Sequence, residues 1–275
     1  MALLPSTILQ ADALTSEAAK ISPDGKDIAV RIIYLEKAFP GHAPVFSKLS
    51  LDIQVGQSVA FIGANGTGKS TLLKSIVRLN EVDQGDIHVF GQPVLSLRGE
   101  ALRSYRSKVG FVFQRHNLVG RLCALSNTIH GAMGRDKSPR NWYQWSARSS
   151  IREEALHCLD RVGLADRALQ RVDLLSGGQS QRVAIARMLM QKPQLVIADE
   201  PDASLDPRAG AEIMDLLLGL AREQHLTVLF VSHHMEHAIA FADRIIGLGE
   251  GKILLDQPSK DADLSELKNF FRVTE

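Results

Sequence analysis

The sequence feature that most constrains the fold is a glycine-rich run at residues 63–71, Gly63-Ala64-Asn65-Gly66-Thr67-Gly68-Lys69-Ser70-Thr71. It matches the pattern G-x-x-x-x-G-K-[ST]. An apolar β-type segment, 59–62, precedes the run, and an apolar helical segment, 72–79, follows it. A strand, a glycine-rich loop and a helix in this order direct backbone amides at a polyphosphate. The run therefore predicts that all nine residues bind a nucleoside triphosphate, without distinguishing a kinase, a GTPase or a motor.

Two side chains of this run carry the expected chemistry. Lys69 can reach the β- and γ-phosphates as a point charge, and the Ser70 hydroxyl can ligate a Mg²⁺ that bridges the same groups. We therefore assign Lys69 to catalysis and nucleotide binding, and Ser70 to the metal.

A second candidate element of the site lies at residues 195–200, where four apolar residues are followed by two acidic ones, Asp199 and Glu200. A carboxylate at the end of a buried strand can hold Mg²⁺, and the next residue can polarise the attacking water. We expect Asp199 to bind Mg²⁺ and Glu200 to act as the catalytic base. A charged loop with no role in chemistry is the alternative.

A histidine follows another apolar strand, 227–231, and the carboxyl ends of parallel strands meet at one edge of a sheet. His233 is therefore expected to contact the γ-phosphate. His234 and His237 lie close by, but their spacing and the lack of acidic or cysteine ligands favour solvent-facing helix positions over a metal site.

A second anion-binding helix start is predicted at Ser176-Gly177-Gly178-Gln179, just before a helical segment at 180–191. Because one chain then carries two phosphate-binding ends in different subdomains, ATP is most simply enclosed between two copies that face head to tail. The alternative is a plain helix cap with a flexible Gly-Gly pair.

Together these residues resemble the ATPase subunit of ATP-binding cassette (ABC) transporters over residues 29–256. The resemblance implies that Phe39 stacks on adenine and that Gln114, after the strand 109–113, ligates Mg²⁺ and couples the site to a partner. It also implies that Ser204-Leu205-Asp206 is the loop that couples the two sites across the dimer, with Asp206 among the nucleotide-binding residues, and that His233 is the switch histidine. The implied ligands are ATP and Mg²⁺. The implied partners are a second copy, integral membrane permease subunits and, indirectly, an extracytoplasmic substrate-binding protein.

A finer resemblance is to the ATPase subunits of phosphonate importers, on residues 116–122, 127, 131, 134–135, 161–164, 170–171 and 203–207. Arg115, Asp202 and the segment 232–237 depart from that pattern. Phosphite or a related phosphorus oxyanion remains open as the substrate. The remaining alternatives are an importer ATPase for another substrate and a soluble ABC-type accessory ATPase, as in a phosphonate-processing complex. DNA repair members carry long coiled-coil insertions, which this sequence lacks.

The expected fold class is α/β. Short apolar β-branched strands predict a parallel sheet flanked by helices, as in a P-loop NTPase core. Helical patterns dominate residues 115–174 and predict a helical subdomain inserted into this core, and the resemblance adds an N-terminal antiparallel β subdomain. We expect a loose extension at 1–27, the ABC ATPase domain at 28–256 with its helical insertion at about 115–175, and a tail with a short helix at 257–275.

Composition excludes several classes of function. Lys and Arg total 32 against 31 Asp and Glu, so no basic field indicates nucleic-acid binding. Cys123 and Cys158 are too few for a disulfide framework, and we expect small buried or half-buried thiols. No apolar run is long enough to cross a bilayer, and the first residues make a poor secretory signal. We therefore expect a cytoplasmic location, and the resemblance implies a peripheral protein on the cytoplasmic face of the membrane, held by permease subunits.

One aromatic cluster, Trp142, Tyr143 and Trp145, has two interpretations. It forms a contact with the membrane subunit, or it packs locally within the helical insertion.

Overall fold

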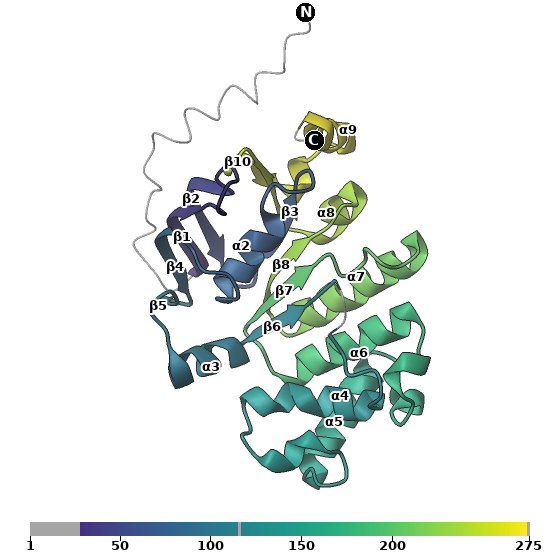
Figure 1. Cartoon of the computed structure of the whole chain (residues 1–275). Helices are drawn as coiled ribbons and strands as arrows, with labels where there is room; N and C mark the ends of the chain where they lie inside the picture. Colours follow the sequence, from purple (N-terminus) through teal and green to yellow (C-terminus); the bar gives the residue numbers. More distant parts are fainter. Residues whose placement is uncertain (1–27, 115–116, 274–275) are drawn as a thin grey trace, which may run out of the picture. The chain divides into compact units, whose positions relative to one another are not determined.

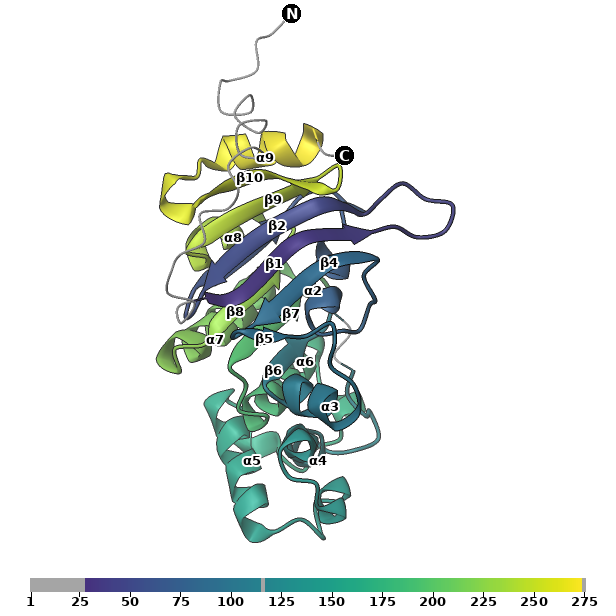
Figure 2. The same ribbon diagram turned by 90° about the vertical axis from the view of Figure 1, so that its left-hand side faces the viewer.

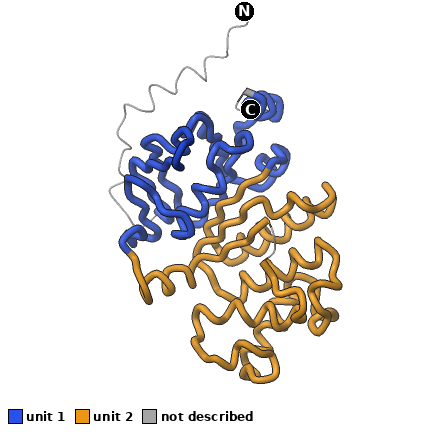
Figure 3. The backbone as a smooth tube through the Cα atoms, in the orientation of Figure 1, with its two compact units in different colours: residues 1–96, 233–275 blue, residues 97–232 orange. Residues whose placement is uncertain are grey.

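The computed structural model describes residues 28–114 and 117–273, which divide into two compact units (Figure 3). Of the described residues, 28–96 and 233–273 belong to the first unit, and 97–114 and 117–232 to the second. The expected extension at 1–27 lies outside the described residues, as does Arg115.

The first unit contains a four-stranded antiparallel sheet in the order β2-β1-β4-β5 (Figures 1 and 2). The strands are β1 (Ile28–Lys37), β2 (Phe46–Gln54), β4 (Gln84–Val89) and β5 (Gln92–Pro93). Arg31 on β1 and Asp52 on β2 are register partners, and a bidentate pair at 2.9 Å joins their side chains. This pair fixes the register on the face that remains partly exposed.

Three further strands of the first unit pair in the order β10-β9-β3, and the glycine-rich run 63–71 follows β3. They are β3 (Ser58–Ile62), β9 (Arg244–Gly249) and β10 (Lys252–Pro258), and β3 runs parallel to β9. Every residue of β3 is buried. Helices α2 (Lys69–Ile76), α8 (Met235–Phe241) and α9 (Leu264–Val273), with the 3-10 helix η5 (Ser259–Asp261), complete this unit.

Helix α2 differs from the predicted segment 72–79. It begins at Lys69 because Gly68, at φ 96°, provides the N-cap, and it ends at Ile76. Arg78 has a left-handed backbone, φ 59°, so the helix cannot continue to residue 79.

The second unit contains parallel strands in the order β8-β7-β6. These are β6 (Val109–Val112), β7 (Leu195–Asp199) and β8 (Thr227–Val231). All residues of β7 and β8 are buried, as the continuous apolar runs predicted for strands covered on both faces. Helices α3 (Gly99–Ser107) and α7 (Pro207–Glu223) belong to the same unit.

The remainder of the second unit is helical. It consists of α4 (Ala124–Ile129), η1 (His130–Gly134), η2 (Pro139–Trp142), α5 (Ser149–Arg161), η3 (Ala165–Arg167), η4 (Val172–Leu174) and α6 (Gly177–Met190). Helix α6 begins three residues earlier than the predicted segment 180–191, because Ser176 caps it. Cys123 and Cys158 are both free and buried, as expected.

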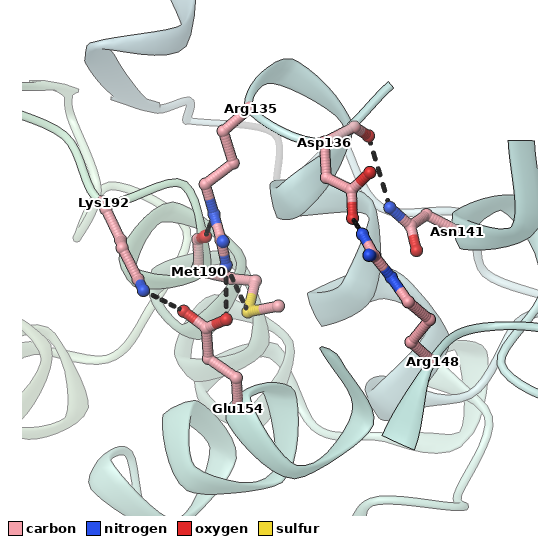
Figure 4. Close-up of polar contacts among 7 residues, drawn as sticks. All are labelled: Arg135, Asp136, Asn141, Arg148, Glu154, Met190 and Lys192. Atoms are coloured by element: carbon pink, nitrogen blue, oxygen red, sulfur yellow. Dashed lines mark hydrogen bonds and ion pairs between the residues drawn. The ribbon is translucent and has the colours of Figure 1, made fainter. Parts of the chain in front are cut away.

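Polar contacts hold the helical elements together (Figure 4). Arg135 pairs with Glu154 at 2.7 Å and donates from Nε to the Met190 carbonyl at 3.0 Å. Lys192 also reaches Glu154, at 2.8 Å. Burial alone would raise the pKa of Glu154, but hydrogen bonds from Lys192 and Arg135 hold the pKa below its ordinary value. The carboxylate therefore stays charged where it joins α5 to the end of α6.

The aromatic cluster lies at the surface of this unit. Trp142, Tyr143 and Trp145 are 62%, 58% and 77% exposed, while the neighbouring Asn141 is fully buried. The rings of Tyr143 and Trp145 stack at 5.7 Å. Tyr143 and Trp145 thus pack on each other, while all three side chains stay largely exposed, so both interpretations remain predictions. Within residues 28–114 and 117–273, no helix is both long and apolar enough to cross a membrane.

We expect Gly131→Ala to destabilise the second unit. A Cβ at Gly131 would lie 2.2 Å from the Arg187 carbonyl oxygen of α6, so the helices must move apart. Overpacking of this kind costs about 1–3 kcal/mol. The control is Gly219→Ala in α7, where a Cβ meets nothing within 4 Å. It should leave thermal stability unchanged or raise it. Equal melting temperatures for the two variants would contradict this packing.

Candidate nucleotide-binding site

The loop between β3 and α2 is shaped by three glycines with left-handed or related backbones, Gly63 (φ 137°), Gly66 (φ 83°) and Gly68 (φ 96°). A Cβ on Gly63 would lie 2.3 Å from the Leu248 carbonyl oxygen. A Cβ on Gly68 would lie 2.6 Å from a methyl of Val45 and 2.8 Å from the Phe46 ring. Only glycine fits at these two positions, so the predicted loop is confirmed as a tight backbone turn.

Lys69 begins α2 and lies inside this loop, only 5% exposed. Its Nζ donates to the carbonyl oxygens of Gly63 and Ala64, at 2.7 Å each. Thr67 closes the turn by donating from Oγ1 to Ala64 at 3.0 Å. A positive charge and a helix N-terminus therefore occur together in one loop, which is an arrangement that suits a polyphosphate.

Two other predicted residues belong to the same unit. His233 is half-buried just before α8, and its ring stands almost perpendicular to that of Phe271, with centroids 6.1 Å apart. Phe39 is 41% exposed in the loop between β1 and β2, and Lys37 Nζ lies 5.2 Å from its ring centroid. An exposed ring of this kind is available for stacking.

The second unit carries the acidic pair. Asp199 ends β7 and is 6% exposed. Glu200 follows in a left-handed conformation, φ 52°, where residues other than glycine are strained. The chain turns sharply here, and Ala203 N donates to the Glu200 carbonyl at 3.3 Å. The two adjacent acids thus occupy different environments, one in the buried strand and one in a strained turn.

The remaining predicted residues also lie in the second unit. Ser176 Oγ accepts from Gln179 N at 3.3 Å and Gln179 Oε1 accepts from Ser176 N at 3.0 Å, a reciprocal capping box. Gly177 is exposed and Gly178 is half-buried. Asp206 caps α7 by accepting from Ala209 N at 3.1 Å, and Gln114 is exposed after β6. The predicted residues therefore divide between the units, with 39, 63–71 and 233 in the first.

One buried carboxylate was noticed in the sequence only as a departure from the phosphonate-importer pattern. Asp202 is 3% exposed, and its Oδ2 accepts from Ser232 Oγ at 3.3 Å. The contact joins the turn after Glu200 to the end of β8, one residue before His233. Neither the pairing nor the burial follows from spacing, because residues 202 and 232 meet only in the fold.

Comparison with known proteins identifies the family. The family model described as ABC transporter matches residues 46–203. The chain belongs to the ABC transporter family. It is 43% identical over 86% of its length to "Phosphonates import ATP-binding protein PhnC" of Frankia casuarinae, covering 92% of that protein. It is 46% identical over 86% of its length to "Phosphate-import ATP-binding protein PhnC" of Mycolicibacterium smegmatis, covering 89% of that protein.

Solved ABC structures show the same fold. The chain matches cbiO1 of Clostridium perfringens, described as part of the transporter complex cbiONQ, with a TM-score of 0.75 and 26% identity. The match covers 86% of this chain and 90% of that one. A dimeric ATP-binding cassette bound to ADP and Pi matches with a TM-score of 0.71 and 32% identity, over 84% and 98% of the two chains. The expected ABC ATPase fold, a P-loop NTPase sheet with antiparallel β and helical parts, is confirmed.

We expect Glu200→Gly to stabilise the protein and abolish ATP turnover. Glycine relieves a strained backbone, which should raise the free energy of unfolding by about 1 kcal/mol, while the carboxylate is lost. Glu200→Ala is the matched control, since it removes the carboxylate and keeps the strain. Thermal unfolding and ATP hydrolysis should therefore separate the two effects. If Glu200→Gly melts at no higher a temperature than Glu200→Ala, the backbone at residue 200 is not strained and the prediction is wrong.

Proposed function

We propose that this ABC protein is the ATP-hydrolysing subunit of an importer for phosphonates or related phosphorus oxyanions. The proposal of ATP hydrolysis rests on the glycine-rich run 63–71, here called the phosphate loop, in which the buried Lys69 lies at the start of α2. Identities of 43% and 46% to proteins named for phosphonate and phosphate import support the substrate class.

In this proposal the first unit binds ATP. Backbone amides of residues 63–71 hold the phosphates, Lys69 neutralises the β- and γ-phosphate charge, and Phe39 stacks on the adenine. Because Lys69 now donates to backbone carbonyls of its own loop, an incoming phosphate would replace neutral acceptors by charged ones. Hydrogen bonds between ions are stronger than those to neutral groups, which favours the exchange.

The hydrolytic step assigned to this chain is the activation of water by Glu200. The carboxylate accepts a proton from the water that attacks the γ-phosphorus, and His233 contacts the γ-phosphate. Ser70, Gln114 and Asp199 offer oxygen ligands of the kind that Mg²⁺ prefers, so these residues fit the metal. Bound Mg²⁺ would neutralise charge on the phosphate oxygens.

We further propose that two copies complete the site. The exposed helix start at Ser176–Gln179 would cover the γ-phosphate bound by the partner, and Asp206 would contact the opposite chain. The dimeric structure bound to ADP and Pi supports this arrangement by similarity. Permease subunits would hold the dimer at the cytoplasmic face of the membrane. Gln114 would then couple the site to a short cytoplasmic helix of the permease. An extracytoplasmic binding protein would deliver the substrate.

We expect Lys69→Ala to abolish ATP hydrolysis and to weaken nucleotide binding strongly, because it removes the charge buried in the loop. Lys74→Ala is the matched control, since Lys74 lies on the same helix, more than a turn away. ATP turnover and titration with a fluorescent ATP analogue measure the two effects. Hydrolysis that survives in Lys69→Ala would refute the assignment of the loop.

The substrate class is tested by reconstitution with the permease subunits and the substrate-binding protein of the same transporter in liposomes. We expect a phosphonate-loaded binding protein to stimulate ATP turnover several-fold. Phosphate, phosphite and a sulfate control are compared in the same assay. Stimulation by sulfate as large as by any phosphorus oxyanion would contradict the substrate class, and stable co-purification with a soluble enzyme complex in place of a permease would favour the accessory-ATPase alternative.

A further inference from the structure

The C-terminal helix α9 packs on α8, the helix that begins two residues after His233 (Figure 1). Lys268 Nζ of α9 pairs with Glu236 Oε1 in the first turn of α8 at 2.8 Å, and this contact lowers the pKa of Glu236. Leu267 is 1% exposed, so α9 also buries an apolar anchor. Helix α9 is therefore seated on the first unit by both charge and apolar contact.

Two adjacent aromatic residues near the end of α9 have different neighbours. The Phe270 ring lies over Gly247 of β9, where a Cβ would approach it to 2.6 Å. Phe271 meets His233, with ring centroids 6.1 Å apart and ring planes at 86°. The contact between Phe270 and Gly247 fixes α9 against β9. The contact between Phe271 and His233 places α9 beside the histidine.

We infer that Phe271 is a positioning residue for His233, and that its ring holds the imidazole in the orientation from which His233 reaches the γ-phosphate. This inference rests on the proposed function. An edge-to-face pair restricts the imidazole to a narrow range of side-chain rotation, which a flexible aliphatic side chain does not do. The interaction energy of such a ring pair corresponds to about a two- to twelvefold change in an equilibrium constant. A misplaced catalytic group can lower a rate by a larger factor.

The test is the ATPase kinetics of the full chain. In Phe271→Leu, an apolar side chain remains but the ring is lost, so kcat should fall at least threefold while KM for ATP stays unchanged. Phe271→Tyr keeps the ring and should retain wild-type kcat. Lys268→Gln is the matched control, because it removes a contact between α9 and α8 without touching either ring. Thermal unfolding confirms that the variants fold.

A double-mutant cycle separates positioning from a structural role. Phe271→Leu should cause no further loss of kcat in the His233→Ala background. The inference is overturned by unchanged kcat in Phe271→Leu, by an equal loss in Lys268→Gln, or by the same fold-loss with and without His233. If the wild-type chain does not hydrolyse ATP, or hydrolyses it equally well as Lys69→Ala, the proposed function itself fails and the inference fails with it.

Discussion

The close approach of Gly68 to Val45 and Phe46 is the contact on which the phosphate loop depends. It seats the loop on the β2 end of the antiparallel sheet, and Gly63 meets the Leu248 carbonyl of β9 on the other side. The loop is thus in contact with two different sheets of the first unit. This arrangement explains why the charge of Lys69 can be buried without the loop opening, since neighbouring backbone carbonyls solvate it.

The other unit stores strain where the proposed chemistry needs it. Glu200 adopts a left-handed backbone directly after a fully buried strand, and the buried Asp202 two residues later contacts Ser232. The strained backbone at Glu200 lowers local stability, and strain of this kind clusters at functional sites. His233 is held differently, by the ring of Phe271 on the C-terminal helix.

Local patterns were sufficient to predict much of the fold. The strands β3, β7 and β8 follow from short apolar runs, and the loop and cap motifs follow from glycine, lysine and serine at fixed spacing. The left-handed Glu200, the carbonyl partners of Lys69 and the contact between Phe271 and His233 could not be predicted. They depend on backbone geometry or on segments far apart in the sequence, which spacing does not encode.

We propose that one chain holds two incomplete halves of a site that a second copy completes. The most direct measurement is the molar mass of Glu200→Gln by light scattering with saturating ATP and Mg²⁺. Because this variant lacks the proposed base, ATP should persist and the ATP-bound dimer should accumulate. The chain of 30.1 kDa should double in mass, and adding Ser176→Arg, which places a bulky side chain at the exposed helix start, should return it to a monomer. A mass that stays monomeric with ATP, in a variant that still binds the nucleotide, would contradict the account, as would a dimer that Ser176→Arg leaves intact.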